Sequence, residues 1–244
     1  MLYNPNNRMN IGVGLLVDHT AINVRAGMGV IPIRDGKYGK TQSLDIQFHR
    51  YGRKLLLDVF FQRYKGYYTQ PAKDSVSLFP DIAVRQIGVE VAYLFNGRKF
   101  SAKAAFEQSE LQVRSAGTFI LGGGIYYNSI HAGTELLPVN ETRINSEQIG
   151  MNAGYAYSWV MSRHWLLASM ATIGLNVGHQ PGMIKLYPGV LGRTAINYRY
   201  ADWGLSFLFL IHNKLLYVPD AGKISQTSVN MQLAYVKNIH NLFH

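Results

Sequence analysis

The stretch Leu44-Asp45-Ile46-Gln47-Phe48-His49 alternates apolar and polar residues without a break. A period of two places successive side chains on opposite faces of a β-strand. The same alternation recurs along most of the chain, for example in Leu55–Gln62, where Asp58 and Gln62 oppose an apolar face. A soluble antiparallel sheet also alternates, but a charged polar face combined with an aromatic-flanked apolar face is typical of transmembrane β-barrels.

Composition narrows the class of protein. The chain has 244 residues, no cysteine and only 16% charged residues, and we expect a single domain over residues 1–244. Without cysteine, neither a disulfide framework nor a thiolate metal site can form. No apolar run approaches the roughly 18 residues that a membrane-spanning helix needs. The net charge of +10 is dispersed over turns, so it does not indicate nucleic-acid binding.

Tight turns divide the chain into strands. Asn96-Gly97, between two alternating runs, predicts a β-hairpin, and short and longer connections alternate along the chain, as in outer-membrane barrels. Longer loops are expected over about 33–42, 64–81, 129–143, 179–185 and 218–224. The predicted strands are 10–18, 21–32, 43–50, 54–63, 82–95, 98–107, 118–128, 144–160, 164–178, 186–200, 203–217 and 225–239.

The expected fold is therefore an all-β, antiparallel transmembrane barrel of about 12–14 strands. Twelve strands follow from the ranges above; a short strand over 108–114 and one strand before Met1 would give the higher, even count. Residues 1–7 are polar and lack the apolar segment of a signal peptide. We expect the export signal and an N-terminal strand to lie upstream of this chain.

The alternation assigns the strand faces. Lipid-facing residues are predicted to include Leu55, Leu57, Val59 and Phe61, and also Phe100, Ala102, Ala104 and Phe106 of the strand expected at 98–107. Aromatic side chains prefer the headgroup level of a membrane. Two aromatic belts are predicted, one near the short turns with Trp159, Trp165, Tyr198, Tyr200 and Trp203, and one near the longer loops with Tyr64, Tyr67, Tyr68, Tyr126, Tyr127, Tyr187 and Tyr217.

The opposite faces carry the candidate functional residues. The predicted lumen-lining set is Arg25, Asp45, His49, Asp58, Glu90, Lys103, Glu107, Arg193, Arg199 and His212. Such residues line a water-filled pore and tune its selectivity, or pair across the lumen and seal it. The residues alone leave both alternatives open.

Several short motifs carry a family resemblance. They are Tyr3-Asn4-Pro5-Asn6-Asn7, Lys37-Tyr38-Gly39-Lys40-Thr41, Tyr64-Lys65-Gly66-Tyr67-Tyr68, Ser115-Ala116-Gly117 and Gly154-Tyr155-Ala156-Tyr157. In this order they resemble a family of predicted outer-membrane barrels in Bacteroidota, domain of unknown function 4421. The resemblance covers most of the chain from Tyr3 onward. It implies a location in the bacterial outer membrane and a segment upstream of Tyr3, and it assigns no residue a functional role.

Three functions are compatible with these features. The first is a porin-like or transport-related protein for small polar solutes. The second is a non-conducting structural or partner-binding barrel in an envelope complex, in contact with outer-membrane lipid and other envelope proteins. The third is a lipid-modifying enzyme, with His49, His164 or His212 acting beside Ser158, Ser169 or Ser206. No nucleophile elbow and no metal-ligand spacing is present, so we expect neither an enzyme, nor a metal, nor a cofactor.

Overall fold

The computed structural model describes residues 2–6, 8–17, 20–32, 36–72, 75–132, 142–180, 183–218 and 222–237. Within this part the chain forms one antiparallel sheet of eleven strands, one short α-helix and one turn of 3₁₀ helix, η1 (Gly36–Tyr38). The strands are β1 (Arg8–Val17), β2 (Thr20–Pro32), β3 (Gln42–Tyr51), β4 (Leu55–Ala72), β5 (Ser75–Leu94), β6 (Ala116–His131), β7 (Arg143–Val160), β8 (Trp165–Gln180), β9 (Met183–Tyr200), β10 (Trp203–Val218) and β11 (Gly222–Lys237).

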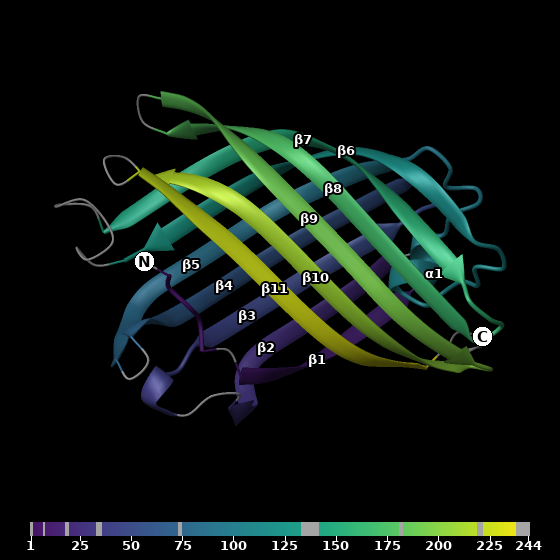
Figure 1. Ribbon diagram of the computed structural model, residues 1–244, viewed down its shortest axis with the longest axis horizontal. Coiled ribbons are helices and arrows are strands. Elements are labelled where there is room, and N and C mark those ends of the chain that lie inside the picture. Colours follow the sequence, from purple (N-terminus) through teal and green to yellow (C-terminus); the bar gives the residue numbers. More distant parts are fainter. Residues whose placement is uncertain are drawn as a thin grey trace.

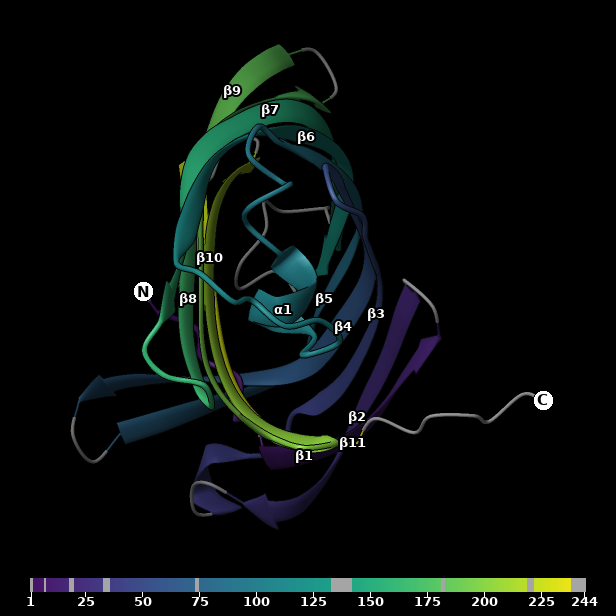
Figure 2. The same cartoon turned by 90° about the vertical axis from the view of Figure 1, so that its right-hand side faces the viewer.

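Each strand pairs with its neighbour in the sequence, so the sheet is a simple meander from β1 to β11. The sheet curls on itself into a barrel-like shape, and the two edge strands approach each other (Figures 1 and 2). The prediction of an all-β antiparallel barrel is thereby confirmed. We call the end of the barrel at residues 161–164 and 201–202 the turn side. The opposite end, where β4 ends at Ala72 and β5 begins at Ser75, is the loop side.

The two faces of the sheet differ in chemistry. On the outer face, Val89, Ile125 and Ile149 lie opposite one another on β5, β6 and β7 and are 41%, 63% and 60% exposed. On the inner face of the same strands, Gln86 and Gln148 are buried. Water-soluble proteins place apolar side chains inside, because burial removes them from water. The inverted pattern here is the one that transmembrane barrels use.

The strand predicted over 98–107 is wrong. Residues 95–115, here called the plug segment, leave the sheet after β5 and enter the barrel interior, where Ala102–Phe106 form helix α1 (Figure 2). Phe100, Ala102 and Ala104 are therefore buried inside instead of facing lipid, and Phe106 is half-buried. The spacing of two fits a strand, but residues 102–105 are three alanines and a lysine, and alanine is the best helix former. Ser101 caps the helix by accepting a hydrogen bond from the Ala104 N–H, at 3.1 Å.

The same detour explains the strand count. Residues 108–114 form no strand, so the described part of the chain contains eleven strands. The loop expected over 64–81 is also largely regular, since β4 and β5 extend into it and Tyr67 pairs with Phe79. A register shift next to Gly66, which has φ +93°, lets the hairpin continue. None of the described helices is long and apolar enough to cross a membrane.

Candidate functional site

Most residues of the predicted lumen set lie on the inner face. The ten residues of the set come from six strands and from the plug segment. Arg25 pairs through its backbone with Asp45, but its side chain lies outside the described part of the structure. Lys103 and Glu107 reach the interior on helix α1 and at its C-cap, not on a strand as expected. The inner-face strand residues are Asp45 and His49 on β3, Asp58 on β4, Glu90 on β5, Arg193 and Arg199 on β9, and His212 on β10.

A polar chain of contacts crosses the interior near the turn side. Gln47 joins Asp45 to His49, with Nε2 3.0 Å from Asp45 Oδ1 and Oε1 3.1 Å from His49 Nε2. His49 Nδ1 contacts Asp58, and the Tyr51 hydroxyl donates to the same carboxylate at 2.9 Å. Arg193 then donates to the Tyr51 hydroxyl at 2.5 Å.

The last of these contacts joins opposite walls. Arg193 is on β9 and Tyr51 on β3, which lie six positions apart in the sheet. Their side chains therefore meet across the lumen, beside the ring of Phe106, whose centroid is 5.2 Å from the Arg193 guanidinium carbon. At this level the interior is spanned by side chains, so an open channel cannot pass here without their displacement.

The plug segment is fixed first by apolar packing. Phe100 is 1% exposed and belongs to a cluster with inner-wall residues of β3 to β8. The buried members are Tyr51, Leu56, Leu94, Phe100, Ala102, Ala105, Ile120, Ala156, Ala168 and Met170. The small alanines on β7 and β8 leave room for α1 between the walls. This cluster makes the turn-side interior a packed core.

The plug segment is fixed secondly by hydrogen bonds centred on Asn197. Its Nδ2 donates to the Ala105 carbonyl at 2.7 Å and to the Ala104 carbonyl at 3.3 Å. Its Oδ1 accepts from Gln108 Nε2 at 3.1 Å and from Ser206 Oγ at 2.7 Å. One buried amide on β9 thus bonds both the end of α1 and Gln108, two residues beyond it.

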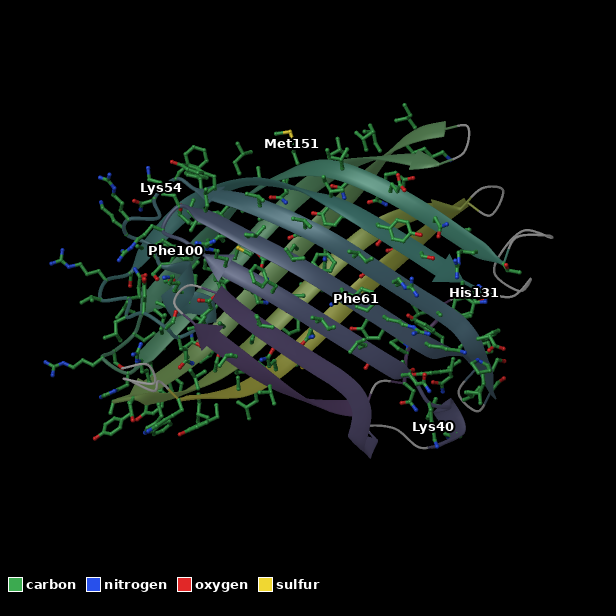
Figure 3. The ribbon with its side chains drawn as sticks, turned by 180° about the vertical axis from the view of Figure 1, so that it is seen from behind. Lys40, Lys54, Phe61, Phe100, His131 and Met151 are labelled. Carbon is green, nitrogen blue, oxygen red and sulfur yellow. The ribbon has the colours of Figure 1, made fainter. Side chains whose placement is uncertain are left out.

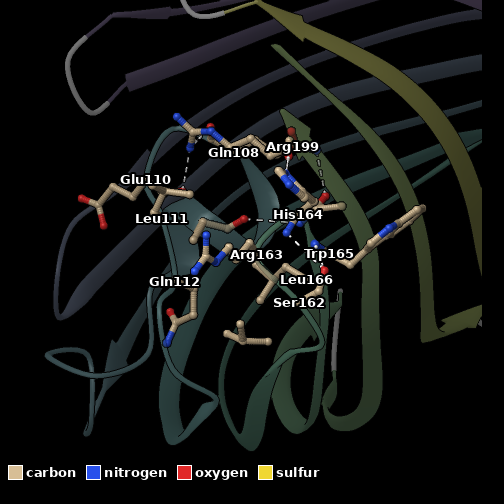
Figure 4. Close-up of a pocket in the computed structure, with 13 residues that line it drawn as sticks. Gln108, Glu110, Leu111, Gln112, Ser162, Arg163, His164, Trp165, Leu166 and Arg199 are labelled. Carbon is tan, nitrogen blue, oxygen red and sulfur yellow. Dashed lines mark hydrogen bonds between the residues drawn. The ribbon is translucent and has the colours of Figure 1, made fainter. Parts of the chain in front are cut away.

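Arg199 binds the part of the plug segment that follows α1. Its Nη1 donates to the carbonyls of Gln108 and Glu110 at 3.3 and 3.1 Å, while its own carbonyl accepts from His164 Nδ1 at 2.8 Å. A small cavity of about 40 Å³ lies between this part of the plug and the β7–β8 turn (Figure 4). Its volume suits a few water molecules, not a solute.

Two carboxylates of the plug segment differ in electrostatics. Burial raises the pKa of Glu107 to about 7, although a hydrogen bond from Ser109 and the charge of Lys103 oppose the shift. Its Oε1 is buried and has no hydrogen-bond partner among the described residues. For Glu110, burial is outweighed by the Ser101 hydroxyl at 2.8 Å and by Lys103 at 3.4 Å, which lower its pKa. Glu107 is therefore the plug group whose charge changes near neutral pH.

The inner wall toward the loop side is lined by amides. Gln86 donates to Asn128 at 3.1 Å across β5 and β6, and Asn176 donates to Gln148 at 3.3 Å across β7 and β8. These bonds join neighbouring strands and follow the wall. A cavity of about 30 Å³ is lined by residues of β5 to β10, among them Glu90 and His212.

The turn-side aromatic belt lies on the outer wall of β7 to β10. Trp165 packs on Tyr198 with 5.0 Å between ring centroids, and Tyr198 packs on Trp203 at 5.7 Å. Trp159 and Tyr200 are exposed at the same end.

The predicted loop-side belt is largely wrong. Tyr68, Tyr126 and Tyr187 are buried, and Tyr126 and Tyr187 share the inner face with Asn128 and Asn176. Glycines make room for the two rings: a Cβ at Gly124 would lie 2.6 Å from the Tyr126 hydroxyl, and one at Gly178 would lie 2.5 Å from the Tyr187 ring.

The other loop-side aromatics differ from one another. Tyr64 pairs opposite the buried Val84 on the inner face, and Tyr67 packs on the buried Ile82 cluster. Tyr127 lies on the outer face, opposite Ile87. The side chain of Tyr217 lies outside the described part.

Several histidines and serines weighed for catalysis contact other groups, whereas the buried Ser158 hydroxyl has no hydrogen-bond partner among the described residues. His49 contacts Asp58 and Gln47, and His164 contacts the Arg199 carbonyl. Ser206 donates to Asn197, and Ser169 lies 3.0 Å from Thr194 on the outer face. Within the described residues, no group of three or more histidine, aspartate or glutamate side chains could hold a metal ion.

The fold and the interior define a class: a barrel-like antiparallel β-protein with apolar side chains outside, polar side chains inside and an internal plug. The chain belongs to the family described as Domain of unknown function (DUF4421), which it matches over residues 1–236. No curated protein and no solved structure matches it.

Sequence reasoning missed the residues that hold the plug. Tyr51, Asn197, Gln108 and Ser206 carry no motif, and their contacts join residues 89 to 142 positions apart in some cases. One local feature could have indicated the detour. Residues 102–105 read Ala-Lys-Ala-Ala after a serine, which is a helix start, not a strand.

Proposed function

We propose that this chain is a transmembrane β-barrel of the bacterial outer membrane that conducts small polar solutes when the plug segment leaves its lumen. The location is supported by the exposed apolar outer wall and by the turn-side aromatic belt. A wall of this kind is stable in lipid and would be unfavourable in water. The proposal assigns the protein no catalytic role and no cofactor.

The observation that carries the transport role is the contrast between plug and wall. The inner face carries polar side chains such as Gln86, Gln148 and Asn176 outside the apolar cluster that packs on the plug, and polar inner faces are typical of conducting barrels. The Asn197 contacts that hold the plug are hydrogen bonds, which water can replace when the plug moves out. In the described conformation the plug segment packs in the turn-side lumen and Arg193 contacts Tyr51 beside it, so we assign this conformation to the closed state and expect the Arg193 contact to break when the plug leaves.

A second candidate is a non-conducting barrel that binds an envelope partner. The apolar cluster around Phe100 favours it, because a packed core resists displacement. Leu111 and Val113, 66% and 81% exposed on the plug segment, offer apolar surface at the turn side for such a partner.

Two measurements on the refolded chain test the proposal. A folded barrel should migrate faster than the boiled protein on a detergent gel, since its paired strands resist the detergent. In planar bilayers the native chain should be closed, and replacement of residues 98–112 by a short Gly-Ser linker should produce stable conductance. The matched control is Phe95→Ala, in the same segment but 60% exposed, which should stay closed.

The outcomes separate the candidates. Heat-dependent mobility with conductance only in the linker variant supports the plugged pore. Heat-dependent mobility without conductance in either protein overturns the pore and leaves the partner-binding barrel. Protein that stays soluble without detergent and shows no mobility shift overturns the membrane location itself.

A further inference from the structure

A pair of arginines lies on the outer wall, away from the plug segment. Arg63 on β4 and Arg85 on β5 are directly opposite each other in the antiparallel register. Gln62, just before Arg63, pairs with Gln86, just after Arg85, on the inner face. Because successive side chains of a strand alternate between the two faces, both arginines lie on the outer face. Both arginines are exposed, and neither has a hydrogen-bond or ion-pair partner among the described residues.

This arrangement is unfavourable in the protein alone. Directly opposite side chains in an antiparallel pair have Cβ atoms about 5 Å apart, and like charges there repel. An anion between the two guanidinium groups would remove the repulsion, and a phosphate accepts the paired N–H groups of arginine in a bidentate manner. The pair is therefore better suited to a bound phosphate group than to bare solvent.

The neighbouring rows place the pair at a boundary. One step toward the barrel middle, Phe61, Ile87 and Tyr127 form a row on the outer face, followed by the exposed row of Val89, Ile125 and Ile149. Figure 3 shows this wall, with Phe61 near its middle and His131 toward the loop side. The rows change from apolar to aromatic to basic toward the loop side. Membrane proteins show this order from the hydrocarbon core to the headgroups.

The row beyond the arginines is also basic. Lys65, His131 and Arg143 occupy one level across β4, β6 and β7, around the small Ala83 of β5. Two carboxylates accompany this patch: Asp81 lies 3.8 Å from Lys65 in an exposed pair, and Glu147 is exposed opposite Tyr127. Since Lys65 is partly neutralised, Arg63, Arg85 and Arg143 dominate the charge.

We infer that the outer wall at Arg63 and Arg85 binds the phosphate headgroup of an anionic lipid in the leaflet around the loop-side end. The arginines hold the phosphate, and the acyl chains lie on the apolar rows below. The inference rests on the proposed membrane location and adds a lipid site that the pore role does not require.

Native mass spectrometry of the refolded chain, released from mixed micelles, tests the site. The probes are a phosphatidylglycerol and a phosphatidylcholine with identical acyl chains. The native protein should retain the anionic lipid about tenfold more than the zwitterionic one, from the attraction of two arginines. The double variant Arg63→Gln and Arg85→Gln should lose this preference. The matched control, Arg53→Gln with Arg98→Gln, removes two equally exposed charges at the turn side and should keep it.

Two further measurements distinguish lipid binding from a structural role of the arginines and from binding of a free anion. In zwitterionic detergent the double variant should be at least as stable as the native protein, because loss of the two arginine charges relieves their repulsion. A lower stability of the double variant would indicate a structural role of the arginines and overturn the inference. Excess inorganic phosphate should not displace the lipid, and displacement would mean that a free anion suffices. If the native protein retains both lipids equally and still shows heat-dependent gel mobility, the lipid site alone is overturned. If the native protein shows no heat-dependent mobility, the membrane location is overturned.

Discussion

The two halves of the barrel interior use the same inner face in different ways. At the turn side, contacts cross the lumen, from Arg193 on β9 to Tyr51 on β3 and from Asn197 to the end of α1. At the loop side, amide bonds such as Gln86 to Asn128 join neighbouring strands and follow the wall. A cross-lumen contact closes the barrel, whereas a contact along the wall only lines it. The difference locates the proposed gate at the turn side.

The largest expected effect comes from the apolar anchor of the plug. Phe100→Ala should weaken plug docking by about 3–5 kcal/mol, since a buried aromatic side chain is lost and a cavity remains. Trypsin cleavage after Lys103, which is buried in the docked plug, should then become fast, with the fragments identified by mass spectrometry. Phe95→Ala is the control, and equal cleavage in both variants would mean that Phe100 does not hold the plug.

The next effect concerns the hydrogen-bond centre. Asn197→Ala should weaken docking by about 2–3 kcal/mol, because Gln108 and the Ala105 carbonyl lose a buried partner. The same cleavage assay measures it. A loop-side amide, in Asn176→Ala, serves as comparison and should leave cleavage after Lys103 unchanged; accelerated cleavage there would erase the distinction between the halves.

Docking of the plug segment at the turn side should depend on pH. The pKa of Glu107 is raised by burial, so its protonated form favours the docked plug at low pH. That contribution is lost as pH rises through about 7. The ratio of the cleavage rate after Lys103 in the native protein to that in Glu107→Gln should increase about tenfold between pH 5 and pH 8, since the pH dependence of trypsin itself cancels in the ratio. An identical pH profile in both proteins would exclude Glu107 as the titrating group.

The smallest effect should come from the loop-side wall. Gln86→Ala removes one amide bond between neighbouring strands and should lower the free energy of unfolding by about 1 kcal/mol. Urea unfolding in detergent measures it, with plug cleavage as the second readout. Release of the plug by this change would show that the two halves are coupled.

The fold was largely predictable from the sequence. Alternation in 44–49 and 55–62 assigns strands and faces correctly, because a period of two depends only on the chain next to each residue. The same rule failed at 98–107, where alanines spaced for a strand also suit a helix. Proximity to a strand end wrongly predicts Tyr126 and Tyr187 in an outer belt, whereas the alternation places both on the inner face, where the structure has them.

The candidate site was predictable in its members but not in its contacts. Asp58, His49 and Arg193 were expected in the lumen by parity, and the structure brings them together through Tyr51. Nothing local in the sequence indicates that Arg193 meets Tyr51, since that contact depends on how tightly the sheet curls. Asn197 was equally hidden, because its partners exist only once the plug has entered the barrel.

Alternation along the chain is enough to predict an antiparallel β-sheet with one apolar and one polar face, because it is a property of each strand alone. The packing of Phe100 and α1 into the turn-side interior emerges only in the folded molecule. The physical reason is packing: Phe100 and the alanines of α1 find a buried apolar partner surface only inside the curled sheet.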